Sequence, residues 1–252
     1  MRKAYLVPIV SFGILLAIYF GLMVDYGDKA DIYNELGIGN ANNGHYILAI
    51  NNFSEAIEIR PDYAIAYNNR GNAKAKLGEK FAAIRDYDKA IELEPDDAKA
   101  YYNRGISKHD LKQYAAAIED YNKAIELDPN YAEAYNNRGN AKANLGEDFA
   151  AIRDYDKAIE LEPDDATAYY NRGNAKHRLK QYAAAIADYD KAIELEPDDA
   201  TTYYNRGSAK HNLDRTLEAK QDFQMALSLA KQAEDKELEA DTLAKMRRLG
   251  LN

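Results

Sequence analysis

The sequence contains no cysteine among its 252 residues. Disulfide bonds, thiolate metal sites and cysteine nucleophiles are therefore excluded. Basic residues are also in deficit, with 33 lysines and arginines against 42 aspartates and glutamates and a formal net charge of −9. A protein that binds nucleic acid is expected to present a basic face. No cluster of lysine and arginine appears, so we expect no nucleic-acid partner.

The recognisable signatures of catalysis are missing as well. The sequence has no phosphate-binding glycine loop, no histidine pair at metal-ligand spacing and no plausible nucleophile with its base. We therefore predict that the chain is not an enzyme and that it uses no cofactor and no metal.

Proline is rare, and its placement reveals an internal repeat. Five of the six prolines are spaced 34 residues apart: Pro61, Pro95, Pro129, Pro163 and Pro197. Taking each proline as the thirty-second place of a unit gives six units that start at Ala30, Ala64, Ala98, Ala132, Ala166 and Ala200. A chain with this period grows by adding units, so it needs no single large core.

Each unit carries the same small and aromatic residues at fixed places. One unit reads AKAYYNRGISKHDLKQYAAAIEDYNKAIELDPNY. The eighth place is always glycine, the twentieth and twenty-seventh are always alanine, and the twenty-fourth is always tyrosine or phenylalanine. Glycine inside a helix costs about 1 kcal/mol relative to alanine. A glycine that recurs in every unit therefore indicates a close approach between two helices.

This pattern resembles the tetratricopeptide repeat, a helix–turn–helix unit of 34 residues. The resemblance implies an all-α fold, a right-handed α-solenoid of six helical hairpins. The units would be residues 30–63, 64–97, 98–131, 132–165, 166–199 and 200–233. A C-terminal capping helix in residues 234–252 would bury Leu238, Leu243 and Met246 against the last unit.

One departure from the family pattern predicts a structural ion pair. The seventh place, usually large and apolar in the family, is arginine in five units, and the twenty-third place is aspartate in the same five. In the first unit these places hold Leu36 and Asn52, so they change together. We predict a bridge between the two helices of each hairpin, formed by Arg70 with Asp86, Arg104 with Asp120, Arg138 with Asp154, Arg172 with Asp188, and Arg206 with Asp222.

The resemblance also implies that the first helices line a concave face that binds a ligand. The sixth place of the repeat holds Asn69, Asn103, Asn137, Asn171 and Asn205. The fifth and ninth places add Tyr102, Tyr170, Tyr204, Asn72, Asn140 and Asn174. Asparagine is a poor helix former, so its recurrence needs a reason. Either these amides hold the backbone of a bound peptide, or they hydrogen-bond to the preceding unit.

The residues present argue against two further kinds of ligand, a metal ion and an acidic C-terminal tail. His109, His177 and His211 share the twelfth place, but the first two lie two units apart and cannot share a metal ion. The clamp with which some relatives bind acidic C-terminal tails requires lysine at the fifth place, where this chain has asparagine and tyrosine.

The first 24 residues differ from the repeats. Residues 4–24 carry no charged residue, follow Arg2 and Lys3, and are long enough to cross a bilayer. We expect a single transmembrane helix that contacts the lipid bilayer, with a cytoplasmic N-terminus, a linker at residues 25–29 and repeats on the non-cytoplasmic side. The alternative is a signal peptide whose cleavage leaves a secreted protein.

These observations favour a membrane-tethered scaffold that binds a protein or peptide in its concave groove. The competing interpretation is an assembly protein that forms a homo-oligomer through the flanks of the solenoid or through its C-terminal helix.

Overall fold

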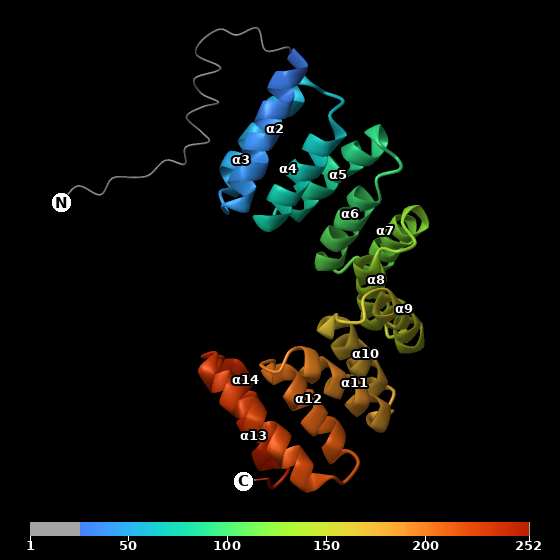
Figure 1. Cartoon of the computed structure of the whole chain (residues 1–252), viewed down its shortest axis with the longest axis vertical. Helices are drawn as coiled ribbons and strands as arrows, with labels where there is room; N and C mark the ends of the chain where they lie inside the picture. The colour runs from blue at the N-terminus through green and yellow to red at the C-terminus, as the bar shows by residue number, and fades with distance from the viewer. Residues whose placement is uncertain (1–25, 252) are drawn as a thin grey trace, which may run out of the picture. The chain divides into compact units, whose positions relative to one another are not determined.

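A computed structural model describes residues 26–251 of the chain. This part of the chain forms thirteen α-helices and no β-strand, as Figure 1 shows. The all-α fold class predicted from the repeat is confirmed. The described residues divide into two compact units, with the boundary between Leu93 and Glu94.

The first compact unit contains two helical hairpins. Its helices are α2 (Tyr26–Asn42), α3 (Tyr46–Ile59), α4 (Ala64–Lys76) and α5 (Lys80–Leu93). Each helix packs against the next along the chain, and α2 also contacts α4. First helices therefore lie beside first helices, as in a stack of hairpins.

The second compact unit contains four hairpins and a final single helix. Its helices are α6 (Ala98–Asp110), α7 (Tyr114–Leu127), α8 (Ala132–Asn144), α9 (Asp148–Leu161), α10 (Ala166–Arg178), α11 (Tyr182–Leu195), α12 (Ala200–His211), α13 (Thr216–Gln232) and α14 (Lys236–Arg248). The first helices contact one another in order, α6 with α8, α8 with α10 and α10 with α12. They form the inner side of this stack in Figure 1, which we call the inner face.

The helix boundaries follow from local chemistry. Proline cannot continue a helix interior, and it stands between the hairpins. In three units the second aspartate after it caps the next helix, as Asp165 Oδ1 accepts a hydrogen bond from Thr167 N at 2.9 Å. The turn inside each hairpin needs a left-handed residue. Gly146 supplies it with a φ of 80°, whereas Lys112 adopts a φ of 59° at the same place in its own unit.

The core of each hairpin is a small-residue contact between its two helices. In the fourth unit the ring of Tyr155 packs against Gly139, and a Cβ at that glycine would lie 2.6 Å from Tyr155 Cε1. Ala151 and Ala158 are completely or almost completely buried on the same second helix. The recurrent glycine is therefore a position where the two helices touch.

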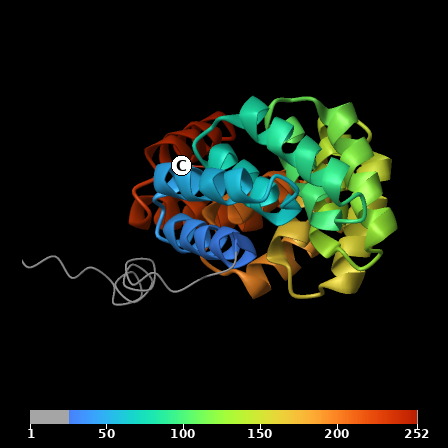
Figure 2. The same ribbon diagram turned by 90° about the horizontal axis from the view of Figure 1, so that it is seen from above.

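The C-terminal helix α14 packs against α13, and the two are adjacent in both views (Figure 1, Figure 2). The side chain of Asp235 caps α14 by accepting a hydrogen bond from Leu238 N at 3.0 Å. Met246 and Leu251 are buried against Ala219 and Phe223 of α13. This helix covers the apolar side that the last hairpin would otherwise expose.

Two expectations about the N-terminal region need correction. Residues 26–29, predicted to be a linker, belong to helix α2, because no proline separates them from the first repeat as it does at the other unit boundaries. The second correction concerns localisation. Within residues 26–251, no helix combines the length and the apolar character needed to cross a membrane.

This finding overturns the prediction of a single-pass membrane protein. A transmembrane helix needs about 20 mainly apolar residues, whereas α2 and α13, the longest helices in the described part, have 17 each. Residues 4–24, on which the prediction of an anchor and of a lipid partner rested, lie outside the described residues.

Candidate functional site

A buried carboxylate joins the two helices of five hairpins. In the fifth unit Arg172 donates two hydrogen bonds to Asp188, from Nε at 3.1 Å and from Nη2 at 2.6 Å. Lys176 Nζ lies 2.7 Å from the same carboxylate. The same arrangement occurs for Arg70 with Asp86, Arg104 with Asp120, Arg138 with Asp154, and Arg206 with Asp222. A lysine four residues after each arginine completes the group in every case.

The remaining guanidinium nitrogen of the arginine, Nη1, forms a hydrogen bond to the preceding unit. Arg172 Nη1 donates to Asp156 Oδ1 at 2.6 Å, and Arg138 Nη1 donates to Asn122 Oδ1 at 2.7 Å. A planar guanidinium can serve a carboxylate and a second acceptor at once because its five N–H groups point in fixed directions. These arginines therefore connect one hairpin to the next.

The sixth-place asparagines also bond to the preceding unit. Asn137 Nδ2 donates to Tyr102 Oη at 2.8 Å, and Asn171 Nδ2 donates to Asn136 Oδ1 at 3.2 Å. The same register gives Asn69 to Asn34 and Asn205 to Tyr170, and Asn103 occupies this place on α6. In the bonds described here, the donor amide of one unit meets the fifth-place side chain of the unit before it.

The ninth-place asparagines accept hydrogen bonds from the buried tyrosines of the core. Tyr155 Oη donates to Asn140 Oδ1 at 2.7 Å, and Tyr189 Oη donates to Asn174 Oδ1 at 2.8 Å. The pair Tyr87 and Asn72 shows the same bond. These amides satisfy buried tyrosine hydroxyls, so one of their polar atoms is already occupied.

Tyr204 and the histidines also have neighbours within the stack. Tyr204 packs in the cluster formed by Phe223, Met246 and Leu251, next to α14. The Nε2 atom of His109 lies 3.1 Å from Asn144 Nδ2 of the following unit. The equivalent separation between His177 Nε2 and Asn212 Nδ2 is 3.4 Å.

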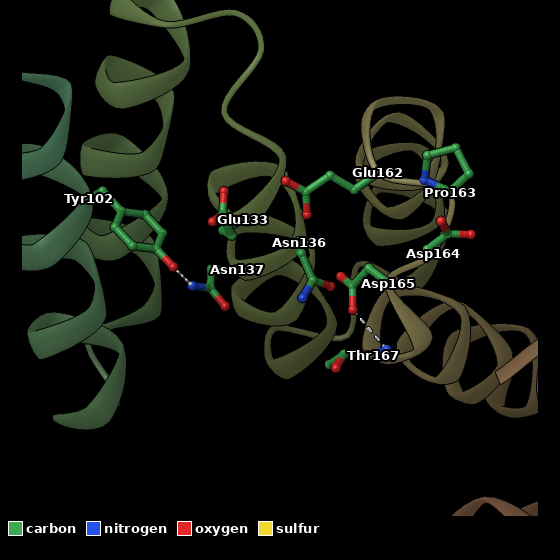
Figure 3. Close-up of a pocket in the computed structure, with 9 residues that line it drawn as sticks. All are labelled: Tyr102, Glu133, Asn136, Asn137, Glu162, Pro163, Asp164, Asp165 and Thr167. Carbon is green, nitrogen blue, oxygen red and sulfur yellow. Dashed lines mark hydrogen bonds between the residues drawn. The ribbon is translucent and has the colours of Figure 1, made fainter. Parts of the chain in front are cut away.

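A cavity of about 650 Å³ opens on the inner face of the second compact unit. Figure 3 shows its lining, which comes from three successive first helices and from the loop before α10. Tyr102 of α6 stands on one side, Asn136 and Asn137 of α8 lie in the middle, and Thr167 of α10 lies on the other side. Of the sequence-predicted site residues, Tyr102 and Asn137 meet in this cavity.

The electrostatics of this cavity are acidic. Its lining includes four carboxylates, those of Glu133, Glu162, Asp164 and Asp165. Burial raises the pKa of the Glu162 carboxyl, and the neighbouring Glu133 and Asp165 raise it further. Burial, together with the Glu133 carboxylate, raises the pKa of Tyr102 to about 12. The site therefore combines an aromatic wall, amides and negative charge.

The four carboxylates were not among the predicted site residues. The signal that could have found them is the recurrent EPDD run at the end of three units, which includes residues 162–165. Its acidic side chains reach the site because the loop before α10 turns toward α8.

Comparison with known proteins identifies the repeat. A family model described as TPR repeat matches residues 41–78, 82–111, 107–146, 144–180 and 173–214. A second model, described as tetratricopeptide repeat, matches residues 200–232. No curated protein shows a significant match to this chain.

Several solved structures share the fold. A crystal structure of MamA protein is 29% identical, with 69% of this chain and 95% of that chain covered and a TM-score of 0.62. YrrB, described as a TPR protein with an unusual peptide-binding site, is 24% identical over 76% of this chain and 97% of that one, with a TM-score of 0.62. PilF of Pseudomonas aeruginosa is 20% identical over 89% and 93%, with a TM-score of 0.66. YrrB and PilF are less than 25% identical to this chain, so their similarity to it shows a shared fold only.

Proposed function

This chain belongs to the tetratricopeptide repeat family, and from that premise we propose that it is a non-catalytic interaction module. Its binding surface would be the inner face of the second compact unit, and its ligand an extended or helical segment of a partner protein. Stacked helical repeats present such surfaces because the small rotation between units leaves one side of the stack hollow.

The observation that carries this proposal is the cavity of about 650 Å³ on that face. It is lined by side chains of α6, α8 and α10 at once, so a segment that lies in it would contact three hairpins. A volume of this size is typical of a ligand site, in which a few polar groups fix the orientation of the bound molecule.

The sixth-place asparagines have two roles in this proposal. Asn137 and Asn171 donate their amide hydrogens to the preceding unit, so they hold neighbouring units of the inner face together. Their second role would be to offer the carbonyl oxygen to a peptide N–H. The same amides can therefore hold two units together and contact a ligand.

The experiment uses the full-length chain and a displayed library of random peptides. Peptides recovered by the wild type are retested against Thr167→Trp, which puts a large ring into the cavity from an exposed position. Thr201→Trp is the matched control, because Thr201 has the same register on α12 and lies outside the cavity. We expect at least a tenfold weaker affinity for the first variant and less than a twofold change for the second. Equal binding by both variants would rule out the inner face as the site.

Self-association is a second candidate, favoured by one observation. Phe81 and Phe149 are each 63% exposed, at the same place of the second and fourth units. Exposed aromatic residues at repeat spacing are typical of contact surfaces. Light scattering on the full-length chain and on Phe81→Ser/Phe149→Ser distinguishes the candidates. A wild-type oligomer that dissociates in the variant would favour assembly.

A further inference from the structure

Three cavities follow one another along the inner face of the second compact unit. The large cavity shares Glu133 with one of about 560 Å³ on one side. It shares Thr167 with a smaller one of about 80 Å³ on the other side. We call this continuous surface the acidic groove, because its lining contains eight carboxylates and one cationic side chain, Lys99.

Two carboxylates at the centre of the acidic groove lack a cationic partner within residues 26–251. Glu133 and Glu162 form no ion pair or side-chain hydrogen bond in this part of the chain, whereas Asp164 interacts electrostatically with Lys191. Other carboxylates are paired at the surface, as Glu160 is with Lys157 at 2.8 Å on the second helix α9. The negative charge of Glu133 and Glu162 is therefore not balanced by an ion pair within the described part of the chain, and the raised pKa of Glu162 arises from burial first and from the carboxylates of Glu133 and Asp165 second.

A buried amide in the same cavity also has an unused donor. Asn136 is only 9% exposed, and its Oδ1 accepts the hydrogen bond from Asn171. Its Nδ2 has no partner among the described residues, and Figure 3 shows the amide between Asn137 and Asp165. Because this nitrogen is not one of the fully enclosed side-chain atoms that lack a partner, its N–H groups open to the cavity. A ligand carbonyl oxygen placed here could accept a hydrogen bond from Asn136 Nδ2.

A main-chain carbonyl and a positive charge occur together in a peptide that contains lysine or arginine. The aromatic wall of Tyr102 fits the same ligand, because aliphatic stems and guanidinium groups pack against aromatic rings. An acidic peptide would be repelled by the four carboxylates of the cavity. A purely apolar peptide would desolvate these carboxylates without giving them a partner.

We infer that the acidic groove binds a lysine- or arginine-containing segment of the partner protein. The cationic side chain would lie between Glu133, Glu162 and Asp165, and Asn136 Nδ2 would donate to a main-chain carbonyl of the same segment. This inference rests on the proposed function and specifies the chemistry of its ligand.

The test extends the peptide selection on the full-length chain. Lysine and arginine should be enriched in the recovered peptides, and replacing them by glutamine should weaken binding at least tenfold. The double variant Glu133→Gln/Glu162→Gln should weaken binding of the original peptides about tenfold. The matched control, Glu126→Gln/Glu160→Gln, removes the same charge from exposed positions on second helices and should change affinity less than twofold. Circular dichroism verifies that both variants are folded.

The possible failures are distinguishable. Recovered peptides without enrichment in cations, or equal losses in the two double variants, would overturn the acidic groove while leaving peptide binding by the inner face intact. A library that yields no peptide sensitive to Thr167→Trp would overturn the proposed function together with this inference.

Discussion

Arg138 and Asp154 stand on opposite helices of one hairpin and are joined by two hydrogen bonds, from Nε to Oδ2 at 2.9 Å and from Nη2 to Oδ1 at 2.7 Å. Lys142 Nζ donates to the same carboxylate at 2.7 Å. One buried aspartate thus balances two cations, which is a bidentate pair strengthened by a third group. Its removal would leave both cations without their partner.

The first prediction concerns this carboxylate. Asp154→Asn should lower the free energy of unfolding by about 2–3 kcal/mol, because breaking a buried ion pair costs about 3–5 kcal/mol and the cations here retain some contact with solvent. Urea denaturation followed by circular dichroism measures the change. Glu160→Gln, which breaks an exposed pair, is the control and should cost less than about 1 kcal/mol.

The first repeat supplies a natural replacement for the whole group. At the three corresponding places it has Leu36, Asn40 and Asn52. We expect the triple variant Arg138→Leu/Lys142→Asn/Asp154→Asn to be more stable than Asp154→Asn alone, since it leaves no unpaired charge. A triple variant that unfolds at a lower urea concentration than the single one would contradict the pairing as the source of the stability.

The second prediction compares two glycines of one helix. In α2, a Cβ at Gly37 would overlap the buried ring of Phe53, whereas a Cβ at Gly39 would meet nothing within 4 Å. Gly37→Ala should therefore destabilise the fold by about 1–3 kcal/mol through overpacking. Gly39→Ala should stabilise it by up to about 1 kcal/mol through helix propensity. Thermal unfolding of the two variants should give shifts of opposite sign, and shifts of the same sign would argue against the close contact.

The third prediction concerns the hydroxyl of Tyr155, which donates to Asn140 at 2.7 Å. Tyr155→Phe should cost about 1 kcal/mol because the amide oxygen loses its donor. The chain already has phenylalanine at this place in Phe53 and Phe223, where the ninth place holds no asparagine. Adding Asn140→Ile, as at Ile38 in the first unit, should recover part of the loss in chemical denaturation. Isoleucine is preferred to the serine of the last unit, because Ser208 has a buried hydroxyl without a partner among the described residues. No recovery would mean that the hydroxyl acts through other neighbours.

The fourth prediction concerns pH. Burial lowers the pKa of His109, and burial with the nearby Lys245 and Arg178 lowers that of His177. The unfolded chain therefore binds protons at a higher pH than the folded chain, so the stability contributed by the neutral rings is lost as the pH falls below about 6.5. Protonation also removes the acceptor that His109 Nε2 offers to Asn144.

Thermal unfolding between about pH 7.5 and 5.5 tests this expectation. His109→Gln/His177→Gln should show a smaller decrease in melting temperature over this range than the wild type. His45→Gln, at an exposed position, should behave like the wild type. Identical pH profiles for all three proteins would assign the decrease to other groups.

Much of the fold could be predicted from one unit of the sequence, because its causes are local and repeat. The recurrent glycine at the eighth place predicted a close helix contact, and the structure shows that the aromatic ring at the twenty-fourth place makes it, as Tyr155 does with Gly139. The joint change of arginine and aspartate in the first unit pointed to a pair that the geometry brings to hydrogen-bond distance in Arg138 and Asp154. Such contacts lie within one hairpin, where helix periodicity alone fixes which side chains face each other.

Only the tertiary structure shows which residues of successive units contact one another and which of them line a common cavity. The sequence left open whether the sixth-place amides hold a bound peptide or bond to the preceding unit, and it did not name the acceptor that Asn171 finds in Asn136. Nor does it indicate that Glu133, at the start of α8, and Glu162, after α9, line one cavity with Tyr102 of α6. The angle between successive hairpins arises from packing across their whole interface, so it brings together residues about 30 to 60 places apart that no local pattern connects.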